Sequence, residues 1–334
     1  MLTNSLKKEL LKILKKLISF NTEDPLGKTK DIIDFVVNSV FKEQDGFQNR
    51  IIEYEKEGVI LHNLISQIGT GNKKIVLCGH FDTVPIGESF SVIFLGTADE
   101  EAGMSGSHYL RENTNIMKDT HILIIPEPTN LKIGIAEKGV IWSKILIHGK
   151  AAHGSMPNKG INAIEGAGKL IPNLKSCLNT VSNPILGKST LNIGRIKGGS
   201  AINVVPEKVE LDLDFRIIPE QDPDLLSKKL KLLDCHPCSM EVKVLVQLPA
   251  LMTETNNSFI VNLKQNVNKN LIGLPYATDA AYLVDPQNPI PFIIFGPGDP
   301  ERIHKIDEYV PLEQIYSCSE YLLKAIIDEF HKDK

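Results

Sequence analysis

Four apolar runs of strand length each end at residues that can bind a metal or carry a proton. The runs KIVLCG, SVIFLG, HILIIP and PFIIFG lead to His80 and Asp82, to Asp99, Glu100 and Glu101, to Glu127, and to Asp299 and His304. In an open α/β sheet, ligands bind in the crevice beyond the carboxyl ends of the strands. Four strands with one direction would gather these histidines and carboxylates in one crevice. The pattern therefore favours metal-assisted hydrolysis.

The length, net charge and cysteine count of the chain narrow the class of protein. A chain of 334 residues suggests roughly two domains. A net charge of -4 favours neither nucleic acid nor a membrane surface as partner. Five scattered cysteines, an odd number, fit a reducing cytoplasmic setting better than a disulfide framework. Lysines interrupt the N-terminal apolar runs, so we expect no secretory signal, and no run reaches the roughly 18 apolar residues of a membrane span.

Periodicity predicts an α/β domain interrupted by an insertion. We expect helices at 5–18, 28–42 and 256–270 and at the C-terminus after Pro311, and strands at 50–55, 58–66, 74–79, 91–96 and 121–126. From Gly139 the order becomes β-α-β-β-α-β, the ferredoxin-like split unit, with Pro172 expected to kink its first helix. The predicted domains are therefore 1–138 with 250–334, and 139–249 inserted between them.

The connection between the strands at 74–79 and 91–96 is too short for a normal crossover. Parallel neighbours need a dozen or more connecting residues, usually including a helix. HFDTVPIGES contains no helical pattern. Either the two strands form an antiparallel hairpin, which would separate His80 from Glu101, or a segment is absent from this chain. We favour an absent segment.

Two motifs carry the clearest chemistry. In GHFDTVP, Asp82 stands two residues after His80, and metal-binding histidines usually donate their second ring N–H to such a carboxylate. In TADEEAG, two adjacent glutamates point in different directions. One of them can bind a metal while the other holds a water as general base. Acidic residues at a helix start can also simply complement the helix dipole.

Two loops add further candidates. Glu127 stands between two prolines in IIPEPTN, which fix the backbone and hold the carboxylate rigidly. A loop acid with no function is the alternative. The segment FGPGDPERIHKIDEYV contains His304, and its glycines, including Gly296, allow backbone to approach a ligand.

The inserted domain contains three more candidates. His153 lies between a strand and a helix, Asn203 lies in GGSAINVVP, and Arg216 ends a strictly alternating strand. An arginine facing a cleft can bind a carboxylate through two hydrogen bonds. The alternatives without a functional role are a turn residue for His153, a capping residue for Asn203 and a surface residue for Arg216. Cys235 and Cys238 form a CxxC pair without a second pair, which we interpret as structural.

The motifs GHFDTVP, TADEEAG, IPEPTN, AAHGSMPNKGINAI, GGSAINVVP and FGPGDPERIHKIDEYV occur in an order that resembles the zinc-dependent aminoacylases. That family includes acetylornithine deacetylase, succinyl-diaminopimelate desuccinylase, aminoacylase and the glutamate carboxypeptidases. The resemblance covers nearly the whole chain. It implies a zinc-exopeptidase-like fold, with a mixed and mostly parallel sheet flanked by helices and a lid or dimerisation domain inserted.

The resemblance also implies roles for individual residues. His80 and Glu127 would bind one divalent metal ion, and Glu101 and His304 the other, zinc being expected and cobalt or manganese possible. Asp82 would orient His80, and Glu100 would be the general base. His153 would reach the active site of the partner subunit in a homodimer and stabilise the oxyanion. Substrate contacts are expected from Asn203, Arg216 and Gly296.

The resemblance implies removal of an acyl group from an N-acyl amino acid of the N-acetylornithine or N-succinyl-diaminopimelate type. Dipeptidase or carboxypeptidase activity with the same chemistry is an alternative. One departure supports a third possibility, an inactive relative. Family members have a GRG-x-x-D-x-K type segment whose aspartate bridges the two metals, and nothing matches it here. Without the bridge, two nearby cations would repel more strongly and bind more weakly.

Overall fold

The computed structural model describes residues 3–18, 20, 29–56, 58–70, 74–78, 91–101, 103–303 and 305–331. The chain divides into two compact units. Unit 1 comprises Met1–Ala136, Met252–Ile272 and Thr278–Lys334, and unit 2 comprises Glu137–Leu251 and Gly273–Ala277. The domain ranges expected from the sequence differ from this division by a few residues at the junctions and by the segment 273–277.

The described part of the chain contains a nine-stranded mixed sheet in the order β1-β2-β4-β3-β5-β17-β6-β15, with β16 also paired to β6. Its centre is parallel, because β3 pairs in parallel with both β4 and β5, and β17 pairs in parallel with β5. The outer pairs β1–β2, β2–β4 and β17–β6 are antiparallel. The strands are β1 (Phe47–Lys56), β2 (Val59–Ile68), β3 (Lys74–Cys78), β4 (Ser91–Gly96), β5 (Thr120–Ile125), β6 (Ile133–Glu137), β15 (Leu251–Met252), β16 (Leu271–Leu274) and β17 (Phe292–Ile294).

The parallel centre settles the direction of the four strands that precede the candidate site residues. The strands β3, β4, β5 and β17 all run the same way, as predicted. The register of β3 and β4 aligns Lys74 with Ser91. The hairpin alternative for these two strands is therefore wrong. The residues that connect them, 79–90, lie outside the described part of the chain.

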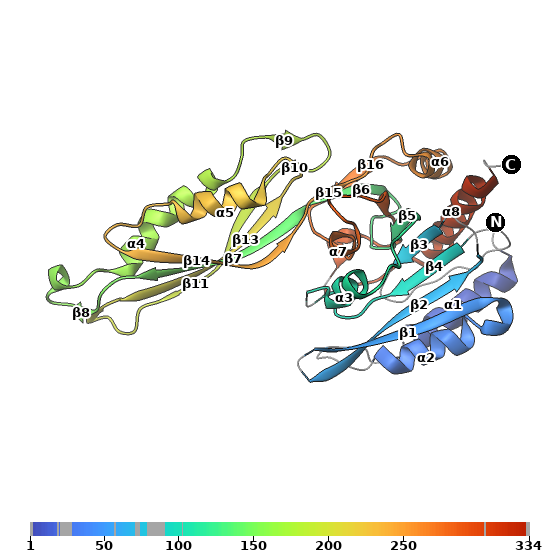
Figure 1. The fold of residues 1–334 in the computed structure, drawn as a ribbon, viewed down its shortest axis with the longest axis horizontal. Helices are drawn as coiled ribbons and strands as arrows, with labels where there is room; N and C mark the ends of the chain where they lie inside the picture. The colour runs from blue at the N-terminus through green and yellow to red at the C-terminus, as the bar shows by residue number, and fades with distance from the viewer. Residues whose placement is uncertain are drawn as a thin grey trace. The chain divides into compact units, whose positions relative to one another are not determined.

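Helices cover both faces of this sheet in unit 1 (Figure 1). Side chains alternate between the two faces of a strand, so Leu64 of β2 packs with Ile33 of α2 while Leu61 packs with Tyr109 of α3 on the opposite face. The helices of unit 1 are α1 (Asn4–Ile18), α2 (Thr29–Ser39), α3 (Ser105–Asn113), α6 (Ser258–Val267), α7 (Ala280–Leu283) and α8 (Leu312–His331), with single 3-10 turns at Glu43–Asp45 and Pro300–Arg302.

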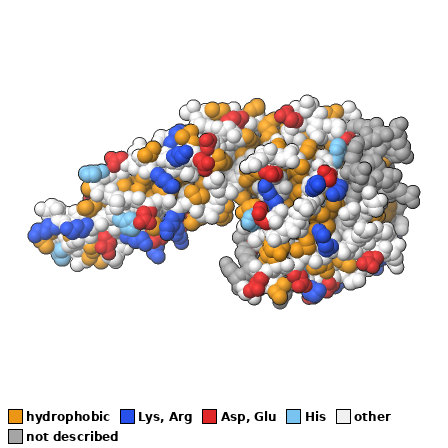
Figure 2. Space-filling view, in the orientation of Figure 1, with side chains coloured by type: hydrophobic (Ala, Val, Ile, Leu, Met, Phe, Trp, Pro, Cys, Tyr) orange, Lys and Arg blue, Asp and Glu red, His pale blue; other side chains and the backbone are white. Residues whose placement is uncertain are grey.

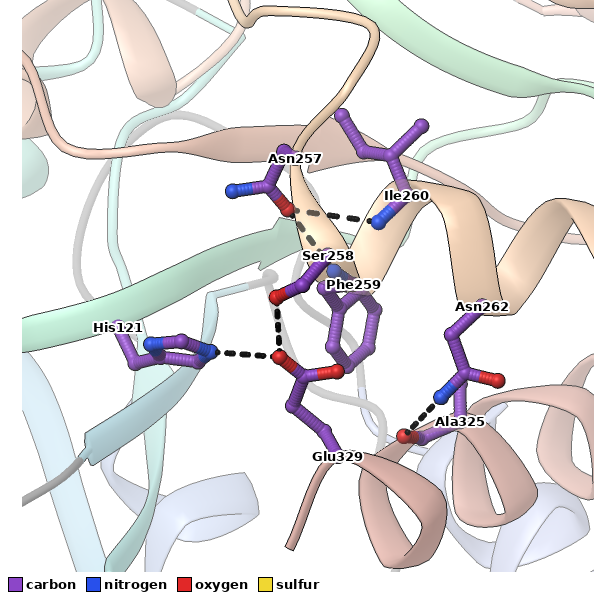
Figure 3. A network of polar contacts seen from close by, with 8 residues as sticks. All are labelled: His121, Asn257, Ser258, Phe259, Ile260, Asn262, Ala325 and Glu329. Carbon is purple, nitrogen blue, oxygen red and sulfur yellow. Dashed lines mark hydrogen bonds and ion pairs between the residues drawn. The ribbon is translucent and has the colours of Figure 1, made fainter. Parts of the chain in front are cut away.

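A polar network joins β5, α6 and α8 of unit 1 (Figure 3). The Glu329 carboxylate of α8 accepts a hydrogen bond from the Ser258 hydroxyl at the start of α6 and lies 3.1 Å from the His121 ring of β5. Asn257 caps α6, its side chain accepting from two backbone N–H groups. These contacts give the C-terminal helix fixed partners on elements that are distant in sequence.

Unit 2 is a ferredoxin-like α/β layer, as predicted. Its chain order is β7 (Gly139–His148), α4 (Ala163–Leu170), β11 (Thr190–Gly198), β13 (Lys208–Ile217), α5 (Pro223–Lys231) and β14 (Ser239–Leu248). The sheet order is β11-β13-β7-β14, with every neighbouring pair antiparallel. The helices α4 and α5 lie on one face (Figure 1) and share a core with the inward residues of β7 and β13.

The predicted kink at Pro172 takes a specific form. The α-helix α4 ends at Leu170 and the chain continues as a 3-10 helix, Ile171–Cys177, with Pro172 in its first turn. Proline cannot donate a backbone hydrogen bond, so the regular α-helix stops where Pro172 would have to contribute one.

Lys and Arg side chains are interspersed with Asp and Glu on the face drawn in Figure 2. Among the described residues, no helix is long and apolar enough to span a bilayer.

Candidate active site

The carboxyl ends of the parallel strands bring acidic residues to one edge of the sheet. The strand β4 is followed by Glu100 and Glu101, and β5 is followed by Glu127. Because β3 pairs in parallel with both of these strands, the residues that follow them lie at the same edge. Glu100 and Glu127 are half-buried and Glu101 is exposed.

The turn after β4 is held by side chains on three other elements. Asp99 has a left-handed φ of 64°, and its carboxylate accepts hydrogen bonds from the backbone N–H and the hydroxyl of Ser105. The buried Asn63 side chain accepts from the Ala98 N–H at 3.2 Å. The Thr97 hydroxyl donates to the Asp279 carboxylate. These contacts fix the backbone from which the two glutamates project.

Tyr54 lies beneath this turn as a neutral group. Its hydroxyl is 3.0 Å from the Ser105 hydroxyl. Burial, followed by the negative charges of Asp99 and Asp279, raises the pKa of Tyr54 to about 12, although the hydrogen bond with Ser105 acts in the opposite direction. Tyr54 therefore supports the turn as an uncharged phenol near neutral pH.

The Glu127 loop is locked to the loop that follows β17. The Gly296 N–H donates to the Thr129 hydroxyl at 3.2 Å, and the Gly296 carbonyl accepts from the backbone N–H groups of Thr129 and Leu131. A side-chain carbon at position 296 would overlap the backbone oxygens of Pro126 and Glu127. Close packing therefore accounts for glycine at this position, independently of the substrate contact expected from the sequence.

Three of the predicted site residues, His80, Asp82 and His304, lie outside the described part of the chain. Among the described residues, no group of three or more His, Cys, Asp or Glu side chains forms a metal site. The described carboxylates at the edge, taken with the two histidines predicted from the sequence, would make a mixed oxygen and imidazole donor set. Such a set fits zinc, cobalt or manganese.

In unit 2 the structure brings two of the three predicted residues together. His153 belongs to a two-residue strand, β8 (Ala152–His153), which pairs with β12 (Val204–Val205) and aligns His153 with Val204. Asn203 comes directly before β12, and its carbonyl accepts from the Gly154 N–H at 2.7 Å. His153 and Asn203 are both exposed at this end of the unit.

Arg216 lies at the opposite end of the same sheet. The pairs His148–Lys208 and Gly139–Ile217 mark the two ends of the β7–β13 ladder, and the eight steps from residue 208 to residue 216 span roughly 27 Å. One small substrate bound to unit 2 therefore cannot contact Arg216 together with His153.

Arg216 already has a carboxylate partner. Its Nε and Nη2 atoms lie 2.9 and 3.1 Å from the two oxygens of Asp214, and Trp142 donates to the same carboxylate. Residues two apart on a strand share a face, so the DFR segment of the sequence contained the signal for this pair. The sequence prediction did not include Asp214.

In the CxxC pair, Cys235 is buried and Cys238 is partly buried. Cys235 and Cys238 are free cysteines, and burial raises the pKa of both thiols. Reactive cysteines have lowered pKa values instead. This supports the structural interpretation.

Comparison with known proteins relates the chain to one group of hydrolases. A family model described as a peptidase dimerisation domain matches residues 135–233. Acetylornithine deacetylase of Pectobacterium atrosepticum is 30% identical over 338 residues, covering 80% of this chain and 83% of that protein. Acetylornithine deacetylase of Proteus mirabilis is 29% identical over 324 residues, covering 80% and 82%.

Solved structures share the fold at lower identity. A tripeptidase from Staphylococcus aureus superposes with a TM-score of 0.74 at 21% identity, covering 96% of this chain and 97% of that one. A Bacillus subtilis protein, a dinuclear metal-binding peptidase from the M20 family, gives a TM-score of 0.63 at 15% identity, covering 97% and 99%. These likenesses show the same fold.

Proposed function

The chain belongs to the M20 family of aminoacylases and peptidases, hydrolases that act on amide bonds, and from this premise we propose that it removes the acyl group from an N-acyl amino acid. The observation that carries the proposal is the parallel centre of the sheet, which directs the residues after β4 and β5 to one edge. The acetylornithine deacetylases among its relatives make N-acetylornithine the first substrate to test.

The proposed chemistry assigns the general base to Glu100. Its half-buried carboxylate would take a proton from the attacking water while the resulting hydroxide adds to the amide carbonyl. When the tetrahedral intermediate collapses, the C–N bond breaks and the same carboxylate returns the proton to the leaving amine. The products are a carboxylate and a free amino acid.

We propose that a pair of divalent metal ions, zinc first, binds at this edge. His80 and Glu127 would hold one ion, Glu101 and His304 the other, and Asp82 would orient His80. A bound divalent metal supplies Lewis acidity that lowers the pKa of water and offsets negative charge on oxygen.

Unit 2 would supply groups to the substrate. His153 and Asn203 would serve the active site of the partner subunit in a homodimer, which is supported by the match to a dimerisation domain. Arg216 would contact the substrate carboxylate with the guanidinium N–H groups that do not face Asp214. The separation of Arg216 from His153 within unit 2 is compatible with their acting from different subunits.

The sequence has no counterpart of the aspartate that bridges the two metals in the family, which supports a form of this function with weaker metal binding and lower turnover. The alignment with the Proteus mirabilis protein extends over 324 positions but includes only 80% of this 334-residue chain. Part of that protein therefore aligns with gaps in this chain. If the lost part includes the bridging aspartate, we expect weak or single-metal binding and low turnover. Elemental analysis of the purified chain tests this, because two zinc ions per chain would contradict a loss of the bridge.

The role of Glu100 is tested by Glu100→Gln. We expect this variant to bind metal as the wild type does and to lose turnover by about 10²–10⁴-fold, since it keeps the shape of the side chain but cannot accept a proton. Glu112→Gln, an exposed change on α3, is the matched control and should keep full turnover. Comparable turnover of Glu100→Gln and wild type would refute the assigned base.

Peptidase activity is the second candidate, favoured by the fold shared with a tripeptidase. A panel of N-acetylornithine, N-succinyl-diaminopimelate, dipeptides and tripeptides separates the two. Cleavage restricted to peptides would replace the deacylase proposal.

We also propose a reducing compartment such as the cytoplasm, because the cysteines at 177, 235, 238 and 318 are free thiols.

A further inference from the structure

The imidazole of His153 is held on one side by the residue two positions later. The Nδ1 atom lies 3.2 Å from the backbone nitrogen of Ser155, whose N–H donates to it, and 2.7 Å from the Ser155 hydroxyl. A ring nitrogen that accepts a backbone N–H carries no proton itself. In the neutral ring the proton must then be on Nε2.

The other side of the ring remains available. His153 is exposed, and within the described residues no hydrogen bond reaches its Nε2 atom. The neutral ring with this tautomer presents one N–H donor to an incoming oxygen. A ring with the opposite tautomer would present a lone pair there and would repel a negatively charged oxygen.

The backbone around His153 is built to keep this contact. The pairing of β8 with β12 fixes the position of His153 in the chain. Gly154 allows the backbone of Asn203 to approach closely, because a side-chain carbon there would lie 2.9 Å from it. The Gly154 N–H is held by the Asn203 carbonyl at 2.7 Å. The sequence His-Gly-Ser therefore acts as one local unit.

We infer that Ser155 is a positioning residue whose backbone N–H fixes His153 as the Nε2–H tautomer and so makes it a hydrogen-bond donor. The consequence for catalysis rests on the proposed function, in which His153 donates to the oxyanion. The tautomer itself does not depend on that function and can be measured without substrate or metal.

The direct test is nitrogen NMR of the full chain with ¹⁵N-labelled histidine, at a pH where the ring is neutral. Long-range proton–nitrogen correlations identify the tautomer, and the spectrum of His153→Gln assigns the signal among the nine histidines. Wild type should show the Nε2–H form. Ser155→Ala and Ser155→Thr both keep the backbone N–H that donates to Nδ1, so both should keep this form.

Ser155→Asp reverses the polarity of the contact. A carboxylate accepts from Nδ1–H, so this variant should lose the neutral Nε2–H signature. A wild-type ring protonated at Nδ1, or a Ser155→Asp spectrum identical to that of wild type, would overturn the inference. Because Ser155 is exposed, these changes should leave the far-UV circular dichroism unaltered.

Turnover separates this inference from the proposed function. Loss of the hydroxyl should lower kcat by about two- to tenfold with little change in KM. Loss of the donor in Ser155→Asp should lower kcat on the order of 10²-fold. A tautomer that shifts as expected while kcat stays constant would support the positioning role of Ser155 and refute the proposed role of His153 in catalysis.

Discussion

At the scale of single residues, the candidate active site depends on backbone held by unremarkable side chains. Asn63, Thr97 and Ser105 fix the turn that carries the paired glutamates, although none of them is expected to take part in the reaction. Gly296 plays a similar part for Glu127, since the two backbones are in contact. Chemistry at this edge therefore requires both the acidic side chains and the groups that hold their loops.

Gly296→Ala tests this dependence. The added carbon would overlap the backbone of Pro126 and Glu127, so we expect a loss of about 1–3 kcal/mol in the free energy of unfolding. Gly168→Ala is the control, because the same carbon at this exposed helical position meets open space and should stabilise the protein by about 0.5–1 kcal/mol. Urea unfolding followed by circular dichroism compares the two. Equal midpoints would contradict the close contact at Gly296.

At the scale of elements, the packing of unit 2 sets the surroundings of three of its cysteines. Cys177 ends the 3-10 helix that follows α4, and only 1% of its surface is exposed. Cys235 and Cys238 lie between α5 and β14. Burial raises the pKa of all three thiols, and for Cys177 the nearby Lys229 opposes this effect.

We therefore expect slow alkylation of these three thiols in the folded protein. A raised pKa leaves less thiolate at pH 8 than in the unfolded chain, where the pKa is about 8.5, and each unit of difference slows the reaction about tenfold. The raised folded values also mean that their contribution to stability is present below about pH 8.5 and is lost as pH rises further. Mass spectrometry after iodoacetamide treatment, with and without urea, measures the rates. Fast labelling of Cys235 without urea would instead indicate a reactive CxxC pair.

At the scale of the whole molecule, the proposal requires two subunits for one active site. If His153 serves the partner, a dimer of one Glu100→Gln subunit and one His153→Gln subunit contains one site with both wild-type groups. Mixing the two inactive variants under conditions that exchange subunits should therefore restore about a quarter of wild-type turnover. No recovery, with mixed dimers verified by mass spectrometry, would place His153 outside the partner's site.

Much of the element pattern was readable from the chain. Strict alternation located β13, and apolar runs located β3, β4, β5 and β17, because burial on one or both faces of a sheet imposes that pattern directly. The short strands β8 and β12 were missed. Two-residue strands are too short to show any periodicity, so the pairing that unites His153 with Asn203 was invisible in the sequence.

The sequence by itself determined which residue types follow each strand, and hence the kind of chemistry to expect. Only the tertiary structure decided that β3 and β4 are parallel, that Arg216 is paired with Asp214 far from His153, and that Ser155 contacts the His153 ring. The physical reason is that side-chain type and periodicity are local properties. Strand direction, ion pairing and ring orientation depend on partners that the chain supplies only after it has folded.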